Sequence, residues 1–154
     1  MAYYQLVGYR WDHWINREVS RVTGSDINHV TIRVLPFSGE SNEIYVSAKA
    51  TDTWLPSKLV ERVNGAPVWK GRKHQIKHFD DLEFIKSKAT WWAQNQPGNI
   101  LYPYFYHYIG RHLGLEVPWT CTRVCAEILQ HFGYRVHEQF YPNKLVQEYI
   151  KEVF

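Results

Sequence analysis

The segment PWTCTRVCAEILQHFGY places a cysteine where covalent chemistry is favoured, at the start of a predicted helix. With Thr120 as the N-terminal cap, Cys121 falls in the first helical turn. Unpaired backbone N–H groups and the helix dipole favour negative charge there, so we expect a lowered thiol pKa. The same N–H groups could hold the oxyanion formed when sulfur attacks a carbonyl. Cys121 is therefore the candidate nucleophile, and Thr120 a candidate substrate-binding residue.

A thiol nucleophile needs an imidazole to remove its proton and later to protonate the leaving group. The stretch INHVTIRV alternates polar and apolar side chains, which predicts a half-buried strand with His29 at its head. A histidine on a strand that faces the start of a helix meets this requirement, so His29 is the candidate general base. Two simpler interpretations remain: Cys121 as a small buried residue of an apolar helical stripe, and His29 as an ordinary polar strand residue.

The elements that must position this pair follow from hydrophobic periodicity and from turn residues. They predict one α+β domain over residues 1–154, in which a small antiparallel sheet packs against helices. Residues 43–50 are expected to pair with the strand of His29 as a hairpin or as a neighbouring antiparallel strand. We expect strands over residues 3–10, 29–34, 43–50 and 67–79, and helices over 11–22, 55–64, 80–95, 103–115, 121–132 and 142–154.

The composition of the 154 residues favours one packed core, because 45% are hydrophobic and 16% are aromatic. A formal net charge of +3, from 18 basic and 15 acidic residues, does not indicate a dedicated nucleic-acid binder. Two cysteines four residues apart suggest a reducing compartment and no disulfide framework. Neither a secretion signal nor a transmembrane segment is predicted, so we expect a soluble, cytoplasmic protein.

Other candidate sites have weaker support in the sequence. Cys125 lies one turn inside the helix, where no free N–H group would stabilise a thiolate, and we interpret it as core. His74 and His78 lack the glutamate of a zinc-protease motif, so a solvated face is favoured over a metal site. The basic run 70–78 could contact phosphate but is typical of a wet surface. The aromatic residues of YPYFYHY could stack on sugars or bases, but they are more typical of a core.

Five stretches, in this order, form a pattern that extends from about Trp11 to Leu145. They are VSRVTGSDINHVTIRV, IYVSAKA, PGNILYPYF, WTCTRVCAEIL and YPNKL. The pattern resembles the circularly permuted members of the papain-like NlpC/P60 superfamily of cysteine hydrolases, the group that includes lecithin:retinol acyltransferase-like proteins. In that group the histidine strand comes first and the cysteine helix last.

The resemblance implies a role for several residues. Cys121 matches the nucleophile and His29 the general base. The third family position is a polar residue on the next strand that orients the imidazole, and here Ser47 fills that slot. Glu43, two alternations earlier on the same face, could replace it in a different register. If neither reaches His29, the ring is poorly oriented and activity is low or absent.

Tyr102 matches a family tyrosine that lines the oxyanion side, although Pro103 replaces the acidic residue that usually follows it. The resemblance implies hydrolysis or acyl transfer at an amide, isopeptide or ester bond, without metal, nucleotide or flavin cofactors. Implied substrates are peptides, peptidoglycan fragments and acyl esters, and similar short chains occur in bacteria and tailed phages. The alternative is a catalytically inactive member of the same fold that serves as a binding module. The sequence does not indicate the oligomeric state.

Overall fold

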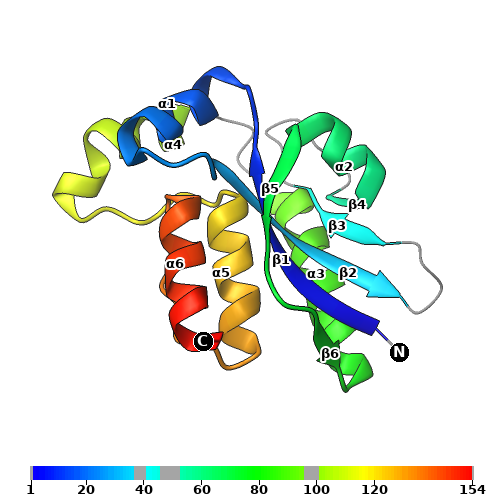
Figure 1. Ribbon diagram of the computed structural model, residues 1–154. Helices are drawn as coiled ribbons and strands as arrows, with labels where there is room; N and C mark the ends of the chain where they lie inside the picture. The colour runs from blue at the N-terminus through cyan, green and yellow to red at the C-terminus, as the bar shows by residue number, and fades with distance from the viewer. Residues whose placement is uncertain (1, 37–40, 46–52, 96–100, 154) are drawn as a thin grey trace.

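One antiparallel sheet forms the centre of the protein (Figure 1). The computed structural model describes residues 2–36, 41–45, 53–95 and 101–153. The sheet of this described part has six strands in the order β4-β3-β2-β1-β5, and β6 also pairs with β1. The strands are β1 (Ala2–Arg10), β2 (His29–Pro36), β3 (Asn42–Ile44), β4 (Trp54–Pro56), β5 (Ala66–Lys70) and β6 (His74–Ile76).

Six α-helices and one short 3-10 helix complete the described part of the chain, so the protein has the expected α+β class. Helices α5 and α6 lie side by side, as Figure 1 shows. No helix among the described residues is both long and apolar enough to cross a membrane. The helices are α1 (Trp14–Thr23), α2 (Ser57–Asn64), α3 (Phe79–Asn95), α4 (Leu101–Tyr108), η1 (Gly110–Leu113), α5 (Cys121–His131) and α6 (Pro142–Val153).

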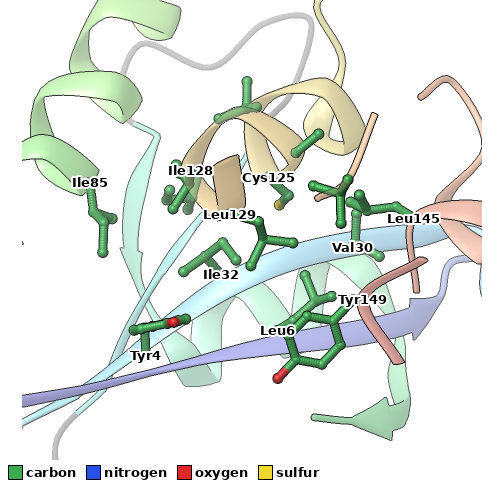
Figure 2. Close-up of a cluster of buried hydrophobic side chains, with 14 of the residues drawn as sticks. Tyr4, Leu6, Val30, Ile32, Ile85, Cys125, Ile128, Leu129, Leu145 and Tyr149 are labelled. Carbon is green, nitrogen blue, oxygen red and sulfur yellow. The ribbon is translucent and has the colours of Figure 1, made fainter. Parts of the chain in front are cut away.

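The main hydrophobic core lies between one face of the sheet and helices α3, α5 and α6 (Figure 2). Val30 and Ile32 of β2 face this core, and both are 0% exposed. Ile128 and Leu129 of α5 pack against them and are equally buried. Each such aliphatic side chain contributes about 1.5–3 kcal/mol by leaving water. This burial holds α5 against β2, and the candidate pair lies at the ends of these two elements.

Helix α2 covers the opposite face of the sheet. Val7 and Tyr9 of β1 pack there with Val60 of α2, and all three are 0% exposed. Tyr4 and Leu6, which precede them in the same strand, belong to the main core on the other face. Strand β1 is therefore covered on both sides, which explains why its central residues include few polar side chains.

Most of the elements predicted from periodicity are present. The antiparallel pairing of β2 with β3 is confirmed by the partner Arg33↔Glu43. Helix α2 ends at Asn64 as predicted, and Gly65 follows with φ +87. A Cβ atom at Gly65 would lie 2.3 Å from the Arg10 carbonyl oxygen, so this turn requires glycine. Most of the strand predicted over 43–50 lies outside the described residues.

Four details of the prediction are wrong. Trp11 precedes helix α1, which begins at Trp14. The helix expected over residues 103–115 is α4, which ends at Tyr108, and the 3-10 helix η1 follows it. Strand β4 was not predicted at all. The strand expected over residues 67–79 is two strands, because β5 pairs with the end of β1 and β6 with its beginning. Between them Gly71 donates its backbone N–H to the Leu6 carbonyl, and a Cβ atom there would lie 3.0–3.2 Å from three neighbours.

Candidate active site

The structure brings Cys121 and His29 into direct contact. The Sγ atom of Cys121 lies 3.0 Å from Nδ1 of His29, although 92 residues separate them in the sequence. His29 is the first residue of β2 and Cys121 the first residue of α5. Because α5 packs along β2, the two element ends meet. A thiol and an imidazole in contact are the groups expected from the sequence as nucleophile and general base.

Thr120 occupies the cap position of α5, as the sequence predicts. Its backbone is extended (φ −108, ψ 175), and its carbonyl accepts the first helical hydrogen bond from Val124. Its side chain makes no capping hydrogen bond, which corrects the expectation of a threonine cap. The buried Thr120 hydroxyl has no partner among the described residues, so it keeps its hydrogen-bonding capacity.

Burial and hydrogen bonds act on the pKa of the Cys121 thiol in opposite directions. Hydrogen bonds from the amides of Val30 and Thr122 lower the pKa of Cys121, but burial has the larger effect and raises this pKa overall. The expected net lowering is therefore wrong: the first-turn environment acts in the expected direction, and desolvation outweighs it. A raised thiol pKa and a lowered imidazole pKa both favour a neutral resting pair, in which the thiol donates to Nδ1.

His29 is buried, with 2% of its surface exposed. Burial lowers its pKa to about 3, so the ring is neutral at physiological pH and able to accept a proton. Because Nδ1 accepts from the thiol, the ring proton resides on Nε2. This Nε2 is buried and has no hydrogen-bond partner among the described residues. The orienting contact of the third family position is therefore absent from the described part of the site.

Glu43 does not reach His29, which corrects its candidacy as the orienting residue. Its carboxylate accepts hydrogen bonds from Tyr9 Oη at 2.6 Å and Thr31 Oγ1 at 2.8 Å. Arg33 Nε donates to it at 2.5 Å. The Glu43 side chain is fully buried and belongs to a structural network beside the sheet. Ser47, the other candidate, lies outside the described residues, so its role stays a prediction.

Tyr102 is not part of the described site either. Its hydroxyl donates to the backbone carbonyl of Glu116 at 2.5 Å. No hydrogen bond links Tyr102 to Cys121 or His29 in the described ranges. The family role on the oxyanion side is therefore not supported, and the amides that face the Cys121 sulfur are the available donors for an oxyanion.

Cys125 is a core residue, as predicted. It is 1% exposed, and burial raises its pKa well above the ordinary range. Figure 2 shows it among the apolar side chains of the main core. Cys121, one turn earlier, is half-buried as a residue, and its thiol contacts His29, so the two cysteines differ in their partners.

Three residues next to His29 carry contacts that the sequence reasoning missed. Tyr9 lies opposite His29 in the β1–β2 pairing. The indole of Trp11 lies 5.7 Å from the imidazole, measured between ring centroids. Asn28 hydrogen-bonds the backbone of Trp11 through its side chain. Local spacing gave no signal for these contacts, because Trp11 fits the apolar pattern of the following helix.

No group of three or more potential metal ligands occurs in the described ranges of the chain. His74 and His78, which are four residues apart in the sequence, are not part of such a group. The ring of His74 hydrogen-bonds the Tyr149 hydroxyl at 2.7 Å and stacks on Tyr4, 5.1 Å away. These contacts give His74 a structural role between β6 and α6.

The free energy of unfolding is expected to decrease as the pH is lowered, because His29 is buried as a neutral ring. In the unfolded chain this ring has its ordinary pKa of 6.5, whereas burial lowers the pKa to about 3 in the folded protein. The unfolded state therefore binds more protons between these values. Stability is complete above pH 6.5 and decreases as the pH falls toward 3. At about pH 4.5 the loss amounts to about 2.5 kcal/mol.

Urea unfolding of the wild type and His29→Gln at about pH 4.5 and about pH 7.5 tests this prediction. Glutamine does not titrate, so the variant should lose much less stability in acid. His74 and His107 also have pKa values lowered by burial, but both variants retain them, and the difference isolates His29. The exposed His112→Gln serves as the control and should behave like the wild type. An equal pH dependence in His29→Gln would contradict the prediction.

Taken together, the fold and the site define an α+β protein with a thiol and an imidazole in contact at the start of a helix. Comparison of the chain with protein-family models, with curated proteins and with solved structures finds no match. The chemistry of the Cys121 and His29 pair therefore rests on its own geometry.

Proposed function

We propose that the protein is a cysteine hydrolase or acyltransferase that acts on an amide, isopeptide or ester bond through an acyl-enzyme intermediate. The observation that carries the proposal is the 3.0 Å contact between Cys121 Sγ and His29 Nδ1 at the start of α5. A neutral imidazole in contact with the thiol is a competent base.

The reaction begins when the thiol proton moves to His29 Nδ1 as sulfur attacks the carbonyl carbon. The C–S bond forms, the carbonyl electrons move to oxygen, and nearby backbone amides stabilise this oxyanion. The bond to the leaving group then breaks, and His29 returns the proton to the departing nitrogen or oxygen. Water, or an acceptor in acyl transfer, gives its proton to His29 and attacks the thioester, which releases the thiol of Cys121.

The fold that we propose is the circularly permuted papain-like fold of the NlpC/P60 superfamily. The chain order supports it, because the strand of His29 comes early in the chain and the helix of Cys121 comes near the end. The proposed substrates are a peptide, a peptidoglycan fragment or an acyl ester. No cofactor is required, because the chemistry needs a thiol, an imidazole and oxyanion donors.

Incubation with p-nitrophenyl acetate tests the proposed function without knowledge of the natural substrate. The expected result is a burst of nitrophenolate, followed by an intact mass increased by one acetyl group. Peptide mapping should place this group on Cys121, while the buried Cys125 stays unmodified until the protein unfolds. Acetylation of both cysteines at equal rates, or of neither, would contradict the proposal.

A binding module with the same fold is the second candidate function. Nε2 of His29 has no partner among the described residues. An imidazolium formed there has no acceptor in the described site to which Nε2–H can donate, and this favours a binding module. Tyr104, Phe105, Tyr108 and Ile109 line a surface hollow of about 510 Å³ that could accept a partner. A folded protein that is not acetylated at Cys121 would favour this second function.

A further inference from the structure

Among the described residues, no hydrogen bond orients the imidazole of His29 through Nε2. Its Nδ1 contacts the Cys121 thiol, and its Nε2 has no partner among the described residues. A single contact with the nucleophile does not fix the plane of a ring. Efficient proton transfer, however, requires the ring to stay aligned with the sulfur.

Two aromatic rings flank His29, one from strand β1 and one from the residue that follows this strand. Tyr9 pairs with His29 across β1 and β2, and their ring centroids are 6.2 Å apart. The indole of Trp11 lies 5.7 Å from the imidazole with an interplanar angle of 69°, an edge-to-face arrangement. Both distances fall in the range in which aromatic rings attract one another. The β1–β5 pairing is irregular between Gly8 and Tyr9, where the strand reaches the site.

Hydrogen bonds anchor the side chain of Tyr9 and the backbone of Trp11. The hydroxyl of Tyr9 donates to the buried carboxylate of Glu43 at 2.6 Å. The backbone N–H of Trp11 donates to Oδ1 of Asn28 at 2.7 Å, and Nδ2 of Asn28 donates to the Trp11 carbonyl at 3.0 Å. Asn28 is 3% exposed and directly precedes His29. One buried amide side chain thus ties the tryptophan to the strand of the histidine.

We infer that Trp11 and Tyr9 are positioning residues that fix the imidazole of His29 by ring packing, with Asn28 as the anchor of Trp11. This inference rests on the proposed function, since it assigns the orientation of the proposed base. In the described part of the site, ring packing acts where the resembled family uses a polar side chain. Trp11 is the better position for a test, because its side chain is half-buried whereas Tyr9 is in the core.

The test compares alkylation of Cys121 by iodoacetamide near pH 7 and near pH 9.5 in the wild type, Trp11→Ala and Trp11→Phe. Near pH 9.5 more thiolate forms without help, so the rate there reports access to the sulfur. Near pH 7 the rate depends on proton removal by His29. Trp11→Ala should lower the ratio of the neutral to the alkaline rate constant about tenfold, and Trp11→Phe should restore it to within about threefold.

Two reference variants make the outcomes distinguishable. Trp14→Ala removes an exposed neighbouring ring that contacts His13 and Tyr104, and it should keep the wild-type ratio. His29→Ala should lower the ratio at least as far as Trp11→Ala does. If His29→Ala leaves the ratio unchanged, the proposed function fails. If His29→Ala lowers it while folded Trp11→Ala does not, the positioning role is overturned and the proposed function stands.

A structural role alone would change the thermal unfolding midpoint of Trp11→Ala without changing the ratio, and this result also overturns the inference. Asn28→Ala provides a second route if Trp11→Ala does not fold. It removes both hydrogen bonds to the Trp11 backbone and keeps the indole. It should lower the ratio in the same direction, and an unchanged ratio in the folded Asn28→Ala protein contradicts the anchoring role.

Discussion

Cys121→Ala is expected to abolish the turnover of p-nitrophenyl acetate, with kcat/KM lower by about 10³-fold or more. The variant lacks the sulfur that lies 3.0 Å from His29 Nδ1, and alanine offers no replacement nucleophile. His29→Ala should lower kcat/KM about 10²-fold. In that variant the thiol keeps its proton, because burial raises the pKa of Cys121.

Cys125→Ala is the matched control for this prediction. It removes the other thiol of the chain, which lies one turn further along the same helix and is 1% exposed. This variant should retain the wild-type kcat/KM while its unfolding free energy falls by about 1 kcal/mol. Steady-state nitrophenolate release and urea unfolding measure the two effects. If Cys121→Ala retains turnover and Cys125→Ala loses it, the assignment of the nucleophile is wrong.

Glu43→Ala is expected to destabilise the protein by about 3–5 kcal/mol. Glu43 is 0% exposed, and its carboxylate is the partner of the buried Arg33 guanidinium and of the hydroxyl groups of Tyr9, Thr31 and Ser57. When the Glu43 carboxylate is removed, Glu61 is the remaining carboxylate partner of Arg33 among the described residues. Glu61 is itself partly exposed. The hydroxyls of Tyr9 and Thr31 lose an acceptor at the same time. Loss of one partner from a buried ion pair is strongly destabilising for this reason.

Urea unfolding near neutral pH measures this loss, and Asp26→Ala is its control. Asp26 pairs with Arg10 at 3.8 Å on the surface, where the Asp26 side chain is 76% exposed and the Arg10 side chain is 67% exposed. Such a pair contributes less than about 1 kcal/mol. A change below about 1 kcal/mol in Glu43→Ala would show that the buried network does not hold β3 against β2.

Local patterns were sufficient to predict β2 and α5, the two elements that carry the candidate pair. Val30 and Ile32 alternate with polar residues, and this period of two is a property of the strand itself. In α5, Thr120 and the apolar stripe through Leu129 define the start and the buried face. Both signals involve residues at most four positions apart, so they can be interpreted without knowledge of the rest of the chain.

The division of residues 66–76 into β5 and β6 could not be predicted in the same way. Both short strands exist because different parts of β1 accept their hydrogen bonds. Strand β4 likewise depends on its pairing with β3. Trp11 satisfies the spacing of helix α1, but Asn28 holds its backbone in the turn before that helix. Hydrogen bonds between distant segments decided each of these cases.

For the candidate site, the sequence by itself determined which side chains are able to do chemistry: a cysteine in the first turn of a helix and a histidine at the head of a strand. The tertiary structure decided that these side chains meet, that Glu43 serves the structural network, and that aromatic rings flank His29. It also decided that burial, and not the helix dipole, dominates the pKa of Cys121. The physical reason is that periodicity and capping depend on neighbours in the sequence, whereas desolvation and packing depend on distant segments that surround each group.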